Sequence, residues 1–240
     1  MGEKGYNRGN LRREALAAAG ARGIVMKRLC VFDLDGTLVN SLGDLADSAN
    51  FALEKRGFPT HPRELYRYFV GGGIPKLIRR ILPQGTSEEE IREVHDLFAR
   101  EYEIRCLDTT APYPGILELL EELEKREVGA AVFSNKDHGF AARIVEALFP
   151  GQRFAFVQGM GQGMPKKPDP AGMLPHLADL GISPGECLYL GDSGVDMRTA
   201  NNAGCLAIGV LWGFREREEL LENGAAQLIC WPLEALDYLD

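Results

Sequence analysis

After residue 114 the chain alternates between helical segments and short apolar runs, and this rhythm restricts the possible folds more than any other feature. It predicts strands at 128–133, 154–157, 187–190, 206–210 and 227–230, and helices at 115–126, 138–148, 171–180, 194–203 and 215–222. Such alternation is typical of a parallel sheet that is covered by helices on both faces. We therefore predict an α/β fold with a doubly wound, mainly parallel, Rossmann-like core.

The stretch from residue 43 to residue 110 follows a different pattern. Apolar residues such as Leu42, Leu45 and Leu53 recur at helical spacing, and no convincing strand interrupts them. This stretch is therefore predicted to be a helical module that is inserted into the α/β core.

These patterns predict three parts. Residues 27–42 and 111–240 form the α/β core, and residues 43–110 form the helical insertion. Residues 1–26 are rich in glycine and arginine, and we expect an N-terminal appendage there, either a short helix or a disordered arm.

Composition excludes several classes of protein. The formal net charge of -8 argues against a nucleic-acid-binding surface, and no apolar run approaches the roughly 20 residues that span a bilayer. The five cysteines are scattered without C-x-x-C spacing, which argues against a disulfide framework or a zinc site. We expect a cytoplasmic protein, a monomer or homodimer, with no nucleic-acid or membrane partner.

The first apolar strand ends in two aspartates, Asp33 and Asp35, which are separated by one residue. Alternate side chains of an extended strand point to the same side, so the two carboxylates can converge in one pocket. Such a pair can bind a divalent cation or divide nucleophilic and proton-transfer roles. The alternative is that Asp35 and Gly36 simply form a turn.

Polar residues also follow three later strands, and in this fold class chemistry lies at the carboxyl ends of strands. Ser134 and Asn135 could hold an oxyanion or cap a helix, and Lys167 could reach a phosphate or lie in a solvated basic turn. Asp192 and Asp196 could cap a helix and face its dipole, but a hard cation better explains so many converging acids. Mg²⁺ would suit these oxygen ligands.

The four strand-end segments together resemble the haloacid dehalogenase superfamily of phosphohydrolases. They are Asp33-Leu34-Asp35-Gly36-Thr37, Ser134-Asn135, Lys167-Pro168 and Gly191-Asp192-Ser193-Gly194-Val195-Asp196. The first and last are specific, and the order of all four makes coincidence unlikely. The helical insertion is similar to the mobile cap of one branch, and residues 39–45 and 69–73 look most like those of phosphoglycolate phosphatases and close relatives.

The resemblance implies specific roles for the aspartates. Asp33 would attack phosphorus and become an aspartyl phosphate, while Asp35 would protonate the leaving oxygen and later deprotonate water. Asp33, the main-chain carbonyl of Asp35 and Asp192 would hold Mg²⁺, with Asp196 supporting the metal indirectly.

The resemblance also implies phosphate-binding residues, which are Thr37, Ser134, Asn135 and Lys167. Lys167 is favoured over Lys166 because the lysine of this family directly precedes the proline.

Substrate choice is expected to reside in the inserted module, which would act as a closing lid. The candidate loop is Gly71–Gly73, with Gly72, Gly73 and Lys76 as substrate contacts. Lys76, Arg79 or Arg80 could bind a second anionic group of the substrate, or they could form a solvated helix face.

The leading functional hypothesis is a Mg²⁺-dependent phosphomonoesterase that acts on a small phosphorylated metabolite resembling phosphoglycolate. An inorganic pyrophosphatase or nucleotide phosphatase on the same scaffold is the nearest alternative. A non-catalytic, phosphate-binding regulatory protein is a third, although the intact pair Asp33 and Asp35 argues against it.

Overall fold

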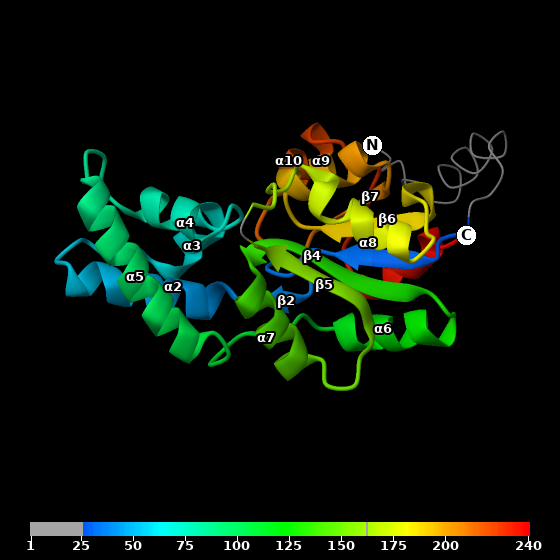
Figure 1. Ribbon diagram of the computed structural model, residues 1–240, viewed down its shortest axis with the longest axis horizontal. Coiled ribbons are helices and arrows are strands. Elements are labelled where there is room, and N and C mark those ends of the chain that lie inside the picture. The colour runs from blue at the N-terminus through cyan, green and yellow to red at the C-terminus, as the bar shows by residue number, and fades with distance from the viewer. Residues whose placement is uncertain (1–25, 162) are drawn as a thin grey trace, which may run out of the picture.

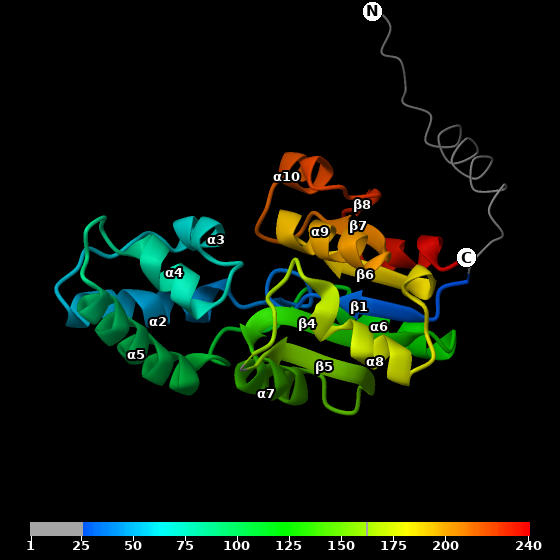
Figure 2. The same cartoon turned by 45° about the horizontal axis from the view of Figure 1, so that its top comes forward.

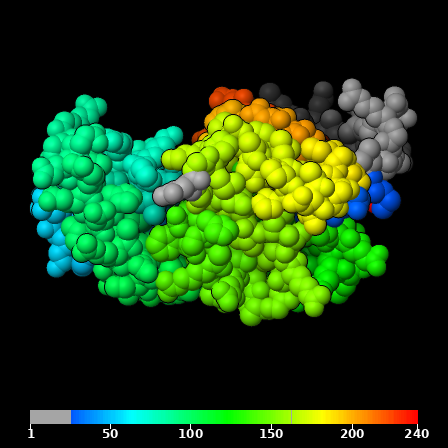
Figure 3. All heavy atoms as spheres, viewed as in Figure 1, coloured from blue at the N-terminus to red at the C-terminus, as the bar shows by residue number. Residues whose placement is uncertain are grey.

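The computed structural model describes residues 26–161 and 163–240. Apart from Met26, the appendage predicted for residues 1–26 lies outside this part of the chain. The described residues form two parts that lie side by side, a purely helical one and a larger α/β one (Figure 1). The space-filling view shows the two parts as lobes in contact along one side (Figure 3).

The larger part contains a six-stranded, fully parallel sheet in the order β5-β4-β1-β6-β7-β8. The strands are β1 (Leu29–Phe32), β4 (Gly129–Asp137), β5 (Phe154–Met160), β6 (Cys187–Gly191), β7 (Leu206–Val210) and β8 (Gln227–Ile229). Every residue of β1 is buried, as expected for an apolar strand at the centre of a sheet that is covered on both faces. The predicted doubly wound parallel sheet is confirmed.

Helices cover both faces of this sheet (Figures 1 and 2). One face packs against α6 (Ile116–Lys125), α7 (His138–Leu148) and the 3₁₀ segment η4 (Pro232–Tyr238). The other face packs against α8 (Leu174–Asp179), α9 (Gly194–Ala203) and α10 (Arg217–Glu222), with the short turns η2 (Pro170–Gly172) and η3 (Pro184–Glu186) nearby. The chain order reverses at β1, so a ligand is expected at the carboxyl end of this strand.

The helical part is built from α2 (Leu42–Lys55), η1 (Arg63–Leu65), α3 (Tyr66–Phe69), α4 (Ile74–Ile81) and α5 (Glu88–Arg105). It has its own apolar core, which includes the fully buried side chains of Tyr66, Phe98 and Tyr102. Ser87 caps α5 through a reciprocal pair of contacts with Glu90. Among the described helices, none is both long and apolar enough to cross a bilayer.

The two chain crossings between the lobes are tied together. The strands β2 (Val39–Asn40) and β3 (Ala111–Pro112) pair in antiparallel orientation. Beside them, the buried carboxylate of Asp44 accepts bonds from the main-chain nitrogens of Thr109 and Thr110, both at 2.9 Å, and from their hydroxyls at 2.5 and 2.6 Å. The start of the helical insertion is therefore fastened to its end.

Strand β4 is longer than the sequence pattern predicts. The apolar run ends at Phe133, but β4 continues to Asp137, with irregular register against β5 beyond Phe133. Ser134, Asn135 and Lys136 therefore belong to the strand and are all buried. The sequence pattern did not predict this extension of β4, because a strand prediction rests on apolar side chains and these three are polar.

Candidate active site

A cavity lies between the two lobes, at the carboxyl ends of β1, β4 and β6. From the core it is lined by residues that include Asp33, Asp35 and Lys167, and from the helical lobe by the Gly71–Gly73 loop and Leu77. The residues that the sequence places at separate strand ends thus meet beneath the inserted helices, as expected at the point where strand order reverses.

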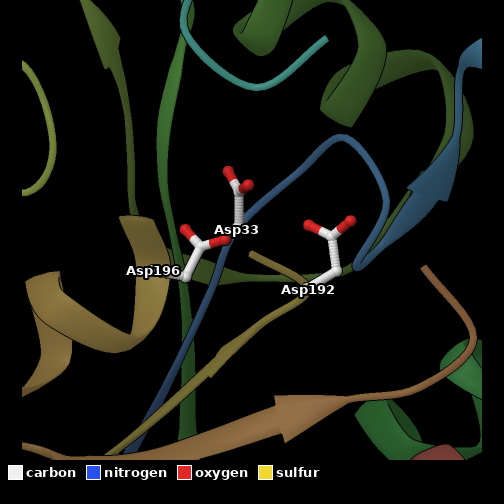
Figure 4. A group of neighbouring side chains, drawn as sticks. All are labelled: Asp33, Asp192 and Asp196. Carbon is white, nitrogen blue, oxygen red and sulfur yellow. The ribbon is translucent and has the colours of Figure 1, made fainter. Parts of the chain in front are cut away.

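Three carboxylates gather at the floor of this cavity. Asp33 follows β1, Asp192 follows β6, and Asp196 lies in the first turn of α9. One oxygen from each lies within 4.8 Å of the others, and all three residues are buried. Figure 4 shows the carboxyl groups pointing to the same side.

Glycines make room for these acids. A Cβ atom on Gly213 would overlap the Asp192 side chain and the main-chain oxygen of Gly36, and one on Gly191 would overlap Asp196. Gly36 also has φ +85°, a conformation that other residues rarely adopt. Sequence reasoning did not single out Gly213, because it lies far along the chain from the first aspartates.

The acid cluster fits a divalent cation. Burial raises the pKa of Asp33 to about 6, although Lys167 opposes this shift. Burial, followed by repulsion from Asp196 and Asp33, raises the pKa of Asp192 well above its usual value. Buried acids with raised pKa values lack sufficient positive charge around them, and a hard cation with oxygen ligands would supply it.

The three acids are not equally available to a metal. Asp196 Oδ1 accepts a bond from Lys167 at 2.6 Å, and its Oδ2 accepts bonds from the main chain and hydroxyl of Ser193 at 3.1 and 2.5 Å. Asp192 Oδ2 accepts one from the main chain of Phe214 at 2.8 Å. Asp33 and Asp192 therefore suit direct ligation better than Asp196, whose oxygens are already occupied.

Lys167 is the buried cation beside the nucleophile candidate. Its Nζ lies 2.9 Å from Asp33 Oδ1 and 2.6 Å from Asp196 Oδ1. Burial alone would lower the pKa of this lysine, but Asp196 and Asp33 outweigh burial and raise it well above its usual value. Lys167 therefore stays charged and can attract an anion, whereas its neighbour Lys166 is exposed.

Asn135 and Ser134 also line the cavity. Asn135 accepts a bond from the main-chain nitrogen of Lys167 at 2.8 Å and donates one to its carbonyl at 3.3 Å, so it fixes the position of the lysine. The Thr37 hydroxyl is buried without a hydrogen-bond partner among the described residues, and Thr37 does not line the cavity. Direct contact of these three residues with phosphate stays a prediction.

Asp35 has partners that sequence reasoning missed. Ser41 donates a bond to Asp35 Oδ1 at 2.5 Å, and Lys136 Nζ lies 3.0 and 3.1 Å from the two carboxylate oxygens. The same ammonium lies 2.7 Å from the hydroxyl of Tyr102, which belongs to α5. Only the position of Lys136, directly after Ser134-Asn135, could have indicated its role.

None of the basic residues that could bind a second anionic group is among those that line the cavity. Lys76 is exposed and packs over Gly72, and Arg79 pairs with Glu88 at 2.6 Å. Arg80 donates to the carbonyl of Phe69 at 3.0 Å. The ion pair of Arg79 is one expected on a solvated helix face, and contact of Lys76 with a substrate stays a prediction.

Unlike these basic residues, the glycines of the Gly71–Gly73 loop lie at the cavity. Both Gly72 and Gly73 line the cavity, together with the apolar side chains of Ile74 and Leu77. This part of the predicted substrate contact is therefore positioned to meet a bound ligand, while the contact itself stays a prediction.

Comparisons with known proteins agree with this geometry. The family model for haloacid dehalogenase-like hydrolases matches residues 30–210. A phosphoglycolate phosphatase of Pseudomonas syringae pv. tomato is 34% identical over 210 residues, which cover 85% of this chain and 76% of that protein. One of Haemophilus influenzae is 34% identical over 204 residues, which cover 82% of this chain and 91% of that protein.

A solved structure of a predicted phosphoglycolate phosphatase from Haemophilus somnus superposes with a TM-score of 0.82. It is 28% identical, and the match covers 91% of this chain and all of that one. A haloacid dehalogenase-like family protein from Streptococcus pneumoniae shares the fold, with a TM-score of 0.80 at 24% identity, over 89% of this chain and 99% of that one. The chain belongs to the haloacid dehalogenase-like hydrolase family, and it is an enzyme of the hydrolase class.

Proposed function

We propose that this hydrolase is a Mg²⁺-dependent phosphatase that removes the phosphoryl group from a small phosphorylated metabolite, with 2-phosphoglycolate as the first candidate. The observation that carries the proposal is the contact between Asp33 and Lys167 at 2.9 Å, beside Asp192, at the floor of a cavity under the cap. The names of the relatives at 34% identity support the choice of substrate.

Asp33 is the nucleophile in this proposal. Its carboxylate oxygen forms a bond to phosphorus as the bond from phosphorus to the leaving oxygen breaks, and Asp35 gives its proton to that oxygen. Asp35 then takes a proton from water, which attacks the aspartyl phosphate and releases inorganic phosphate. The free carboxylate of Asp33 is thereby restored.

Lys167 counters the charge of the phosphoryl oxygens and of Asp33, and Asn135 fixes the lysine in place. Asp33, Asp192 and the main-chain carbonyl of Asp35 would hold Mg²⁺, which supplies further neutralisation of charge between nucleophile and phosphate. Asp196 is the positioning partner of Lys167 and Ser193.

The cap restricts the leaving group. Gly71–Gly73, Leu45 and Leu77 line the cavity from the helical lobe, so the alcohol portion of the substrate lies against small and apolar surface. We place the enzyme in the cytoplasm, where reduced thiols persist, because all five cysteines are unpaired.

Phosphate release from purified protein tests the proposal. The panel comprises 2-phosphoglycolate, pyrophosphate, nucleotides and sugar phosphates, each with Mg²⁺ or with a chelator. We expect release from 2-phosphoglycolate that depends on Mg²⁺ and falls by at least about a thousandfold in Asp33→Asn. Undiminished hydrolysis by Asp33→Asn contradicts the assignment of Asp33 as the nucleophile. Stronger hydrolysis of pyrophosphate or of nucleotides favours a pyrophosphatase or a nucleotide phosphatase instead.

A further inference from the structure

Three cationic residues line the described part of the cavity, and the proposed mechanism uses one of them. Lys167 serves the nucleophile. Arg215 donates bonds to main-chain carbonyls of the cap, that of Arg67 and, at 2.7 Å, that of Val70. Lys136 neither contacts the nucleophile nor bonds to a cap carbonyl, although its side chain is only 4% exposed.

Lys136 lies on the side of the leaving group. Its ammonium contacts the carboxylate of Asp35 at 3.0 and 3.1 Å, and its nearest carboxylate is not the nucleophile Asp33. A general acid must come within about 2.6–3.2 Å of the oxygen that it protonates. A group next to Asp35 is therefore also next to the leaving alcohol.

The surroundings of Lys136 suit an anion. Tyr102 approaches it from the cap and Asp35 from the core, and both residues line the cavity. An ammonium has three donors, and one of its two bonds to Asp35 can be exchanged for a bond to another oxygen while the second bond is kept. The apolar side chains of Leu45 and Leu77 limit water here, which strengthens charge pairing.

We propose that Lys136, assisted by the hydroxyl of Tyr102, binds an acid group on the leaving alcohol and so selects phosphate esters of small hydroxy acids. The inference rests on the proposed phosphatase function and assigns the substrate class to a residue of the core. In a phosphorylated 2-hydroxy acid, one carbon separates the ester oxygen from the carboxylate carbon. One molecule can therefore present its ester oxygen to Asp35 and its carboxylate to Lys136.

The test compares 2-phosphoglycolate with ethyl phosphate, which has the same two-carbon chain but no carboxylate. We expect the wild-type protein to favour 2-phosphoglycolate in kcat/KM, and Lys136→Met to reduce that preference by about ten- to a hundredfold, the range of a charge-assisted bond. Tyr102→Phe keeps the ring packing and is expected to reduce the preference by about two- to fivefold. Lys166→Met, at an exposed neighbouring site, serves as the control.

An equal loss of kcat/KM on both substrates in Lys136→Met overturns the inference, because the lysine then acts only through Asp35. A wild-type preference for ethyl phosphate also overturns it and leaves the phosphatase function intact. Should Lys136→Met fail to fold, an unchanged preference in Tyr102→Phe counts against the inference.

A binding measurement separates this inference from the proposed function. Calorimetry on Asp33→Asn and on the Asp33→Asn/Lys136→Met double variant gives the Kd of each ester without turnover. We expect the ratio of the two Kd values to change by about ten- to a hundredfold between these proteins. An unchanged ratio overturns the role of Lys136 even if the protein hydrolyses neither ester, which by itself would contradict only the phosphatase function.

Discussion

The carboxylate of Asp192 accepts a hydrogen bond of 2.8 Å from the main-chain nitrogen of Phe214. The carbonyl of Phe214 in turn accepts a bond of 2.8 Å from Arg67 of the cap. In the opposite direction, Arg215 of the core donates bonds to the main-chain carbonyls of Arg67 and Val70 in the cap. The acid that we expect to bind metal is thus joined through one loop to the lobe that covers the cavity.

Replacement of Arg67 is therefore expected to weaken closure of the cap. Arg67→Gln loses the bond to Phe214 and the ion pair with Glu216 at 2.9 Å. We expect KM for the best substrate to rise by about three- to tenfold, with a smaller change in kcat, because the core residues that are proposed to bind phosphate are untouched. Steady-state kinetics measure both constants, and Arg63→Gln, whose partner Asp47 lies within the cap, is the control.

Asp192→Asn is expected to abolish metal-dependent activity and yet stabilise the metal-free protein. The raised pKa of Asp192 shows that its charge is unfavourable in the folded state, because of burial and of nearby Asp196 and Asp33. In the presence of a chelator we expect a gain of about 1 kcal/mol or more in the free energy of unfolding. Urea denaturation measures it, with exposed Asp179→Asn as the control; a loss of stability contradicts the assignment.

Stability of the metal-free protein is expected to depend on pH through Asp33. Its folded pKa of about 6 is raised above the usual 3.8, so the folded state binds this proton more tightly than the unfolded state. The contribution to stability is complete below pH 3.8 and is lost as pH rises toward 6, by at most about 3 kcal/mol. The difference between wild type and Asp33→Asn in urea denaturation across this range isolates the effect, and a flat difference contradicts it.

The hydrogen bonds from Thr109 and Thr110 to Asp44, which join the two chain crossings, are expected to stabilise the folded protein. Asp44→Asn replaces one accepting oxygen with an amide that cannot accept bonds from Thr109 or Thr110, and we expect a loss of about 2–4 kcal/mol in unfolding free energy. Asp47→Asn, which removes an exposed charge paired with Arg63, is expected to cost less than about 1 kcal/mol. Equal losses of unfolding free energy in Asp44→Asn and Asp47→Asn would mean that the bonds to Asp44 stabilise the fold no more than an exposed ion pair does.

Gly213→Ala is expected to impair the metal site because its added methyl group would overlap Asp192 and the carbonyl of Gly36. We expect weaker binding of Mg²⁺ by about tenfold or more, measured by calorimetry. Gly185→Ala, where nothing lies within 4 Å, is the matched control. Unchanged Mg²⁺ affinity in Gly213→Ala would show that the loop can move aside at little cost.

Much of the candidate site was predictable because short motifs follow strands whose apolar pattern is clear. Asp33, Asp192 and Lys167 lie around one cavity since the carboxyl ends of parallel strands meet at one edge. Lys136 and Tyr102 could not be paired in this way. Their contact depends on the unpredicted extension of β4 and on how the cap packs over the core, and neither follows from local periodicity.

The short ribbon of β2 and β3 places the entry and exit of the cap side by side, at Asn40 and Ala111. An insert whose two ends are neighbours can be exchanged for another without changing the spacing or order of the strands on which it sits. The surface that surrounds the leaving group can therefore diversify while the chemistry at phosphorus is inherited intact. By the same geometry, the acid-binding role proposed for Lys136 would not depend on the identity of the cap, because the lysine belongs to the sheet.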